Sequence, residues 1–309
     1  MQFQANALLH SLAHAWIQTP DLDRAIALCH EAIGLAVIDE GRVDEHWATP
    51  RRDARWVLLG DPDETAGRLC LIEGEARADQ DGLPRGLDSV EIVVGDVDVV
   101  AARIDAAPGT RRLGQTFDAD LTELGGNQHR SALWHMPWGT HFIITAGLTA
   151  TPGRDFPSTG RMAGRVFEVH VRTDSHADGL RFYADALGMP ALMTAHLDRG
   201  PIHQAWGLAE GTTVDMDLLK TGPEGTGLGA VELQGHAAET LQAGARGGTA
   251  GLTFEAGDLP AVHTALTDAG YRPTPIAPCP AGPSAGVPGF TVRGVEGEPI
   301  EIIEARTTA

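Results

Sequence analysis

Cysteine and positive charge are both scarce in this sequence. The chain has only three cysteines in 309 residues, Cys29, Cys70 and Cys279, and these are too scattered for a disulfide framework or a cysteine-based zinc site. Lysine and arginine number 23 against 42 acidic residues, which gives a formal net charge of −19. Nucleic acids and anionic membranes require a basic surface, so we expect neither as a partner.

Long apolar runs and the common nucleotide or hydrolase motifs are also missing. No run approaches the roughly 18 apolar residues of a membrane span, and the start MQFQANALLHSLAHAW lacks the pattern of a signal peptide. We therefore expect a cytoplasmic protein. There is no Walker loop, dinucleotide fingerprint, nucleophile elbow or HExxH motif, so we expect no nucleotide cofactor. Hydrophobic residues at 42% and charged residues at 21% are typical of a globular protein.

What the sequence does contain is an internal repeat with an offset of about 155 residues. The matching pairs of segments are 28–35 (LCHEAIGL) with 182–189 (FYADALGM), 94–97 (VGDV) with 256–259 (AGDL), and 138–144 (WGTHFII) with 296–302 (EGEPIEI). This spacing is too long for a solenoid and predicts two tandem copies of one domain. We place the copies at 1–150 and 164–309, with a linker from Asp155 to Ala163.

Each half divides again into two modules in which a strand and a helix precede further strands. Their approximate bounds are 8–75, 86–147, 164–221 and 250–305. The helices are expected at 22–33 and 177–187, after the capping residues Asp21 and Ser175 and before Gly34 and Gly188, and at 97–107 and 259–269. In the strand around 167–172, apolar Phe167, Val169 and Val171 alternate with Glu168, His170 and Arg172. Such alternation predicts one face packed on a helix and one face lining a wetter space.

The helix signature at 180–189 (LRFYADALGM), its weaker copy at 21–35, and the closing strands at 136–139 (MPWG) and 297–301 (GEPIE) resemble the vicinal oxygen chelate superfamily. This group includes glyoxalases, extradiol dioxygenases and bleomycin-binding proteins. The resemblance covers nearly the whole chain. It implies an α+β fold in which four βαβββ modules form two cupped, mixed β-sheet domains with helices on the outer face.

The resemblance also implies where metal ligands would lie, on the first and last strands of each module. The first-strand positions fall on His14, Ser89, Glu168 and Gly251, and the last-strand positions on Cys70, Ile143, Asp217 and Glu301. If modules pair in sequence, Glu168, Asp217 and Glu301 share one cup. If they pair one with four and two with three, His14 meets Glu301, and Glu168 and Asp217 meet Ser89. The sequence leaves both pairings open.

Four ionisable residues are the candidate catalytic groups. Glu301 lies in the otherwise apolar strand 300–303, and the alternation of side chains along the strand places it on the polar face. A carboxylate that points inward is costly to bury without a partner. Glu168 is a candidate ligand or base, or else a partner for Arg172. His170 is a candidate general base or a structural histidine. Asp217 is a candidate ligand, or a solvated residue at a strand end. For one divalent ion, iron, manganese, nickel or zinc, the candidate ligands are Glu301, Glu168 and His14.

Substrate contacts are expected from His14, Trp16, Arg172 and His203, whose positions favour the cup-facing side of their strands. The segment Pro273–Gly289 contains six prolines and three glycines and predicts an irregular loop, either a lid or a passive surface loop.

Two functions remain open from the sequence. The first is an enzyme of lyase or isomerase type, which performs acid–base chemistry on an oxygenated or aromatic small molecule, either alone or assisted by a divalent ion. Ring-cleaving dioxygenase chemistry is less supported, because the two-histidine, one-carboxylate set of such enzymes is incomplete. The second is metal-free binding or sequestration of a small molecule. A homodimeric assembly is left open.

Overall fold

Four consecutive modules, each with a strand, a helix and further strands, make up the computed structural model, which describes residues 8–75, 83–124, 127–149, 156–246 and 248–305. The first contains β1 (Leu9–Thr19), α1 (Leu22–Ala27) continued by the π-helix η1 (Leu28–Ile33), β2 (Ala36–Val43), β3 (Ala54–Gly60) and β4 (Arg68–Glu73). The second contains β5 (Leu83–Val94), α2 (Val97–Ala106), β6 (Arg111–Asp120), η2 (Thr122–Leu124), β7 (Gln128–His135) and β8 (His141–Gly147).

The second half of the chain repeats this plan with insertions. The third module contains β9 (Ala163–Thr173), α3 (His176–Leu180) continued by the π-helix η3 (Arg181–Ala186), β10 (Ala191–Leu197), α4 (Pro201–Ala205), β11 (Val214–Lys220), η4 (Pro223–Gly225) and β12 (Ala230–Gly235). After β13 (Leu241–Arg246), the fourth contains β14 (Thr249–Ala256), α5 (Leu259–Asp268), β15 (Ala277–Pro278), β16 (Pro288–Arg293) and β17 (Pro299–Glu304). The third module thus extends to Gly235, whereas the sequence pattern predicted its end near residue 221.

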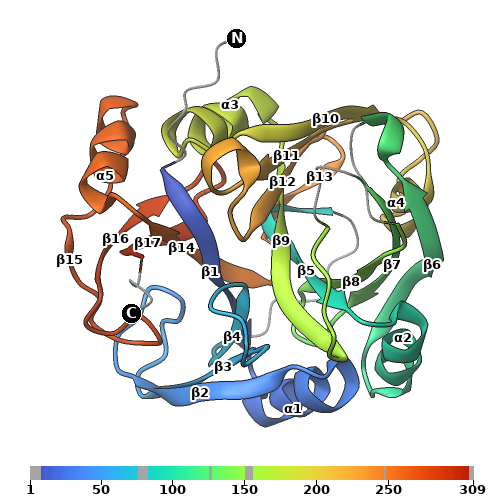
Figure 1. Ribbon diagram of the computed structural model, residues 1–309, viewed down its shortest axis with the longest axis horizontal. Helices are drawn as coiled ribbons and strands as arrows, with labels where there is room; N and C mark the ends of the chain where they lie inside the picture. The colour runs from blue at the N-terminus through green and yellow to red at the C-terminus, as the bar shows by residue number, and fades with distance from the viewer. Residues whose placement is uncertain (1–7, 76–82, 125–126, 150–155, 247, 306–309) are drawn as a thin grey trace.

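The strands form two mixed sheets, and each sheet combines one module from either half of the chain (Figure 1). The first sheet has the order β15-β16-β17-β14-β1-β4-β3-β2, and the second β10-β11-β12-β9-β5-β8-β7-β6 with β13 beside β5. Module one therefore pairs with module four, and module two with module three. In Figure 1 the blue and red strands lie together on the left, while the teal, green and yellow strands lie to the right.

This pairing decides between the two arrangements that the sequence left open. The central contacts are antiparallel, between β1 and β14 in the first sheet and between β5 and β9 in the second. The division at 1–150 and 164–309 stays a prediction about the repeat, because neither sheet is confined to one half. Asp155, the first residue of the predicted linker, lies outside the described residues.

Local sequence explains where the helices begin and end. The Asp21 side chain accepts a hydrogen bond from the backbone N–H of Arg24 at the start of α1, and Gly34 takes a φ of 100° after η1, which suits glycine. Ser175 precedes α3 as predicted but makes no capping bond, since its hydroxyl donates to the Asp178 carboxylate. Within the described ranges, no helix is both long and apolar enough to cross a membrane.

One hydrophobic core runs between the helices and the apolar faces of both sheets. It includes Val169 and Val171 of β9, Phe182 of η3, and Leu252 and Phe254 of β14, all fully buried. Because side chains alternate along a strand, the residues between them point to the opposite, concave face of each sheet. We call these concave faces the first cup, on the first sheet, and the second cup, on the second sheet.

Candidate functional site

The second cup brings a buried histidine together with carboxylates from two strands. In the antiparallel pair of β5 and β9, Glu91 lies opposite Glu168, and Ser89 lies opposite His170. Directly opposed residues project on the same side of a sheet, so Glu91, Glu168 and His170 all enter the cup. Each is at most 8% exposed.

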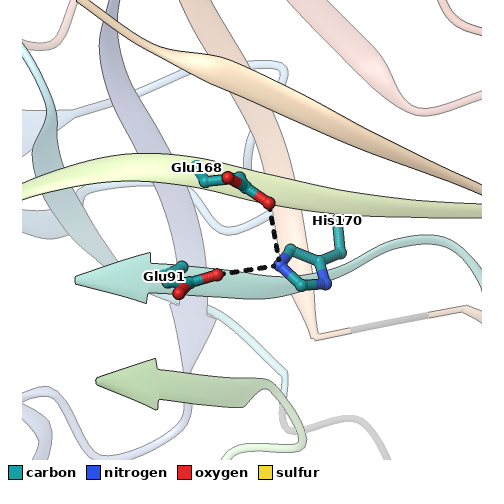
Figure 2. A group of neighbouring side chains, drawn as sticks. All are labelled: Glu91, Glu168 and His170. Carbon is teal, nitrogen blue, oxygen red and sulfur yellow. Dashed lines mark hydrogen bonds and ion pairs between the residues drawn. The ribbon is translucent and has the colours of Figure 1, made fainter. Parts of the chain in front are cut away.

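These three side chains converge on one point (Figure 2). His170 Nε2 lies 3.3 Å from Glu91 Oε2 and 3.5 Å from Glu168 Oε1. Figure 2 shows one ring nitrogen of His170 directed at a carboxylate oxygen of Glu168, from the same strand β9, and at one of Glu91, from the neighbouring strand β5. One ligand atom from each residue lies within 4.8 Å of the others.

A third carboxylate, that of Glu232 on the neighbouring strand β12, approaches the other ring nitrogen of His170. Glu232 lies opposite His170 in the parallel pair of β12 and β9, and its Oε1 is 3.4 Å from His170 Nδ1. The amide of Gln234 donates a 2.5 Å hydrogen bond to the same oxygen of Glu232. The ring is therefore held from both of its nitrogens, which fixes its orientation.

Burial and mutual charge give the groups of the cluster different proton affinities. Burial, followed by the negative charges of Glu91 and Glu232, holds the pKa of Glu168 well above its usual range. Burial also disfavours ionisation of Glu91, but the hydrogen bond and charge of His170 outweigh it and lower the pKa of Glu91. For His170, burial opposes the positive charge, while Glu232 and Glu91 more than offset it and raise the pKa. The cluster thus combines one carboxyl that holds its proton more tightly than usual with another that releases it more readily.

The cluster also fits a divalent cation. Three carboxylates surround one imidazole at a buried place, and carboxylate oxygens with an imidazole nitrogen are a donor set used for iron, manganese, nickel or zinc. Glu91, Glu168 and Nε2 of His170 would hold the ion. Glu232 contacts the other ring nitrogen, Nδ1. A carboxylate in this position commonly orients a histidine that binds a metal.

A buried ion pair lies beside the cluster on the same strands. Arg172 of β9 donates to Asp88 Oδ2 and, at 3.0 Å, to Gln234 Oε1, and its guanidinium lies 3.9 Å from the ring centre of Trp206. His141 Nδ1 is 2.7 Å from the same Asp88 oxygen. Arg172 Nη2 is buried and has no hydrogen-bond partner among the described residues, and a buried donor of this kind is normally satisfied by a water molecule or a ligand.

His203 and Trp206 lie on and just after α4, the insertion between β10 and β11. His203 is 3% exposed, and its Nε2 is 2.7 Å from the Thr212 carbonyl oxygen. Trp206 packs on Arg172 and His141, with a centroid distance of 4.9 Å to the latter. The insertion therefore covers the end of the second cup at which Arg172 lies.

The placement of Asp217 in a cup is wrong. Asp217 lies on β11, not on the last strand of its module, and it opposes Leu233, a residue of the hydrophobic core. It therefore projects on the helix side of the sheet, where His176 Nε2 approaches its Oδ2 at 3.1 Å. The last-strand position of module three belongs to Glu232.

The predicted metal set of Glu301, Glu168 and His14 is not brought together. Glu168 belongs to the second sheet, whereas His14 of β1 and Glu301 of β17 belong to the first, separated by β14. Within the described part of the chain, Glu168 groups with Glu91 and His170 as a candidate ligand and not with His14 or Glu301. Ser89, the other expected ligand position of the second cup, donates its hydroxyl hydrogen to Asp88.

The first cup contains the remaining candidates. Glu301 is 3% exposed and accepts hydrogen bonds from Trp47 Nε1 at 3.3 Å and from the Thr253 hydroxyl at 3.0 Å. Trp16 is fully buried and donates from Nε1 to the same Thr253 oxygen at 2.9 Å. His14 lies beside Trp16, with ring centroids 5.3 Å apart. A cavity of about 630 Å³ opens next to Glu301.

Glu91 and Glu232 were not among the sequence-predicted site residues. Glu91 carries a usable signal, because it alternates with Val90 and Ile92 and so has cup parity. The same holds for Glu232, between Val231 and Leu233. Glu232 was not predicted because the expected end of the third module, at residue 221, excluded strand β12.

Solved structures with this architecture identify the fold. Glyoxalase I from Zea mays is similar over 95% of this chain and 92% of its own, with a TM-score of 0.65 and 18% identity. A Bacillus subtilis protein proposed to be a dioxygenase is similar over 97% of this chain and 86% of its own, with a TM-score of 0.64 and 10% identity. No family model and no curated protein matches the sequence. The chain thus has the cupped fold of the vicinal oxygen chelate proteins, as its sequence motifs implied.

Proposed function

We propose that this chain is an enzyme that performs acid–base chemistry of lyase or isomerase type on a small oxygenated or aromatic substrate in the second cup. The observation that carries the proposal is the convergence of Glu91 and Glu168 on Nε2 of His170 in a buried place. Perturbed carboxyl groups in a concave, buried cluster are typical of catalytic sites. Solved proteins of the same fold include a glyoxalase I.

The residues of the cluster take different roles in this proposal. Glu91 and His170 are fixed ligands of a divalent ion, because Glu91 ionises most easily and Glu232 orients the imidazole. Such an ion, when bound, would supply a Lewis acid that stabilises negative charge on a substrate oxygen. Glu168 is the third ligand of the ion and also the group that moves the proton, since its carboxyl holds a proton more tightly than usual.

Arg172 and His203 are the proposed substrate contacts. The unpartnered Nη2 of Arg172 can donate to a substrate oxygen, while its other nitrogens stay bound to Asp88 and Gln234. His203 comes from the insertion that covers this part of the cup. Among the described residues, the group of candidate ligands contains one imidazole, that of His170. This composition favours proton transfer over ring cleavage, for which two histidine ligands would be expected.

The experiment is elemental analysis of protein purified without chelators, for wild type, Glu168→Gln and Glu301→Gln. We expect about one iron, manganese, nickel or zinc ion per chain in the wild type, and affinity reduced more than about tenfold in Glu168→Gln. Glu301→Gln is the matched control, because it removes an equally buried carboxylate from the other sheet. A wild type that retains no ion even after incubation with each of these metals and desalting would overturn the metal assignment.

Proton transfer is measured separately from metal content. With dihydroxyacetone in deuterium oxide as a probe, carbon-bound hydrogen should exchange in the presence of wild type, and the rate should fall about 10²- to 10⁴-fold in Glu168→Gln. The alternative function, binding without turnover, predicts no exchange for this or any substrate of a wider panel of small hydroxycarbonyl compounds. That result, with ligands recovered unchanged, would reject the enzyme.

A further inference from the structure

The first cup contains a ligand-sized cavity that the proposed enzyme site does not use. Its volume is about 630 Å³, within the range of roughly 300–1,000 Å³ found for small-molecule sites. The walls come from the segment between β2 and β3, from the proline-rich loop before β16, and from Glu301 of β17. The carboxylate–histidine cluster lies in the other sheet, so the two places are separate.

Glu301 gives the cavity a buried negative group. Its carboxylate is held by the indole of Trp47 and the hydroxyl of Thr253, both uncharged donors. None of the ion pairs formed among the described residues involves Glu301. A carboxylate at 3% exposure without a positive partner is costly to ionise. A ligand that brings a positive charge would remove this cost.

Aromatic rings line the cavity beside this carboxylate. Trp47 and His46 have ring centroids 4.9 Å apart, and both rings face the cavity. Trp16 packs behind them, with centroids 4.4 Å from His46 and 5.3 Å from Trp47. Burial lowers the pKa of His46 to about 4, so its ring is uncharged at neutral pH. The faces of such rings attract cations and stack on flat molecules.

The remaining charges of the wall also favour a positive ligand. Arg52, a basic residue of the wall, points into solvent with an exposed side chain and lies 3.9 Å from the carboxylate of Glu45. This leaves Asp44 near the opening and Glu301 in the interior without a basic counterpart in the wall.

We propose that the first cup binds a flat organic cation, such as an N-alkylated nitrogen heterocycle. Its ring system lies against Trp47 and His46, and its positive charge lies near Glu301. This site does not depend on the function proposed for the second cup, and it needs no metal.

The test compares three probes of similar size and shape by isothermal titration calorimetry at pH 8. These are 1-methylquinolinium, which is a cation, quinoline, which is neutral at this pH, and 1-naphthoate, which is an anion. We expect the cation to bind on the order of tenfold to a hundredfold tighter than quinoline, the size of one charge-assisted interaction in a partly buried site, and we expect naphthoate to bind weakest.

Two variants and a control locate the binding. Glu301→Gln should abolish the preference for 1-methylquinolinium over quinoline while both still bind, and Trp47→Leu should weaken both probes. Glu168→Gln, in the other sheet, should change neither affinity. The wild-type comparison alone is decisive if a variant folds poorly: equal affinities for cation and neutral probe, or tighter binding of the anion, would overturn the proposal. So would an unchanged preference in folded Glu301→Gln. Metal content and proton exchange report on the second cup independently.

Discussion

Two buried carboxyl groups, Asp88 and Glu301, differ sharply in their surroundings. Asp88 is buried, which by itself would raise its pKa, but the charges of Arg172 and His141 outweigh burial and lower it. Burial raises the pKa of Glu301, and the hydrogen bonds from Trp47 and Thr253 only partly compensate. Asp88 is thus held as an anion in an ion pair, whereas Glu301 is ionised only with difficulty.

Removing the charge of Asp88 should strongly destabilise the fold. Asp88→Asn leaves the fully buried guanidinium of Arg172 without its counter-ion, at a cost of about 3–5 kcal/mol in the free energy of unfolding. Urea denaturation of wild type and variant measures this. Asp53→Asn is the control, because the ion pair of Asp53 with Arg42 is solvent-exposed and contributes about 0–1 kcal/mol. Equal effects of the two substitutions would contradict the view that Arg172 depends on Asp88.

Glu301 should make the ligand-free protein less stable as the pH rises. A carboxyl whose pKa is raised on folding binds its proton more tightly in the folded state, so its stabilising contribution is complete below the ordinary carboxyl pKa and is lost as the pH rises through the raised value. Glu301→Gln does not titrate. Its stability relative to wild type should therefore improve between pH 5 and pH 8 in urea denaturation. Parallel pH profiles for the two proteins would refute this.

Among the elements, the four helices expected from capping patterns are present, but α4 lies where a strand was expected around His203, and strand order was not predicted. Helix ends depend on neighbours in sequence, such as Asp21 and Gly34, so capping patterns reveal them. The pairing of β1 with β14 and of β5 with β9 depends on contacts between distant segments, which no local pattern encodes. The alternation in β9 correctly placed Glu168 and His170 on one face. The prediction for Asp217 was wrong because β11 was taken as the last strand of its module, whereas the last strand is β12.

The N-cap of α2 offers a test of these local rules. Asp96 accepts hydrogen bonds from the backbone N–H groups of Asp98 and Val99, so Asp96→Ala should cost about 1 kcal/mol of stability. Ser175→Ala is the comparison, because Ser175 stands at the start of α3 but makes no capping bond, and it should cost clearly less. Thermal unfolding of both variants measures the difference. An equal or larger loss for Ser175→Ala would show that the capping bonds of Asp96 contribute little.

For the molecule as a whole, the two sheets link the halves of the chain. Each sheet takes one module from each side of the repeat, and one core extends across both sheets. The cups are built across the β1–β14 and β5–β9 contacts, so both candidate sites need both halves. The sequence could predict the modules from their repeat, but the partner of each module follows only from the three-dimensional contacts.

The halves 1–150 and 164–309 should not fold independently. Expressed alone, either half would expose the central strands of two incomplete sheets, and we expect it to lack a cooperative thermal transition. Mixed in equal amounts, the halves should regain that transition and the metal binding of the intact chain. Cooperative unfolding of an isolated half, measured by calorimetry, would refute this expectation.

The nested pairing of modules also sets an order for folding during synthesis. Module one leaves the ribosome first, yet its partner strand β14 belongs to the last module. The second sheet, whose two modules are adjacent in sequence, can close while translation continues. Throughout that interval the unpaired edge of β1 is open to another nascent chain, so the speed of elongation and the supply of chaperones should determine how much of the protein reaches its native state in the cell.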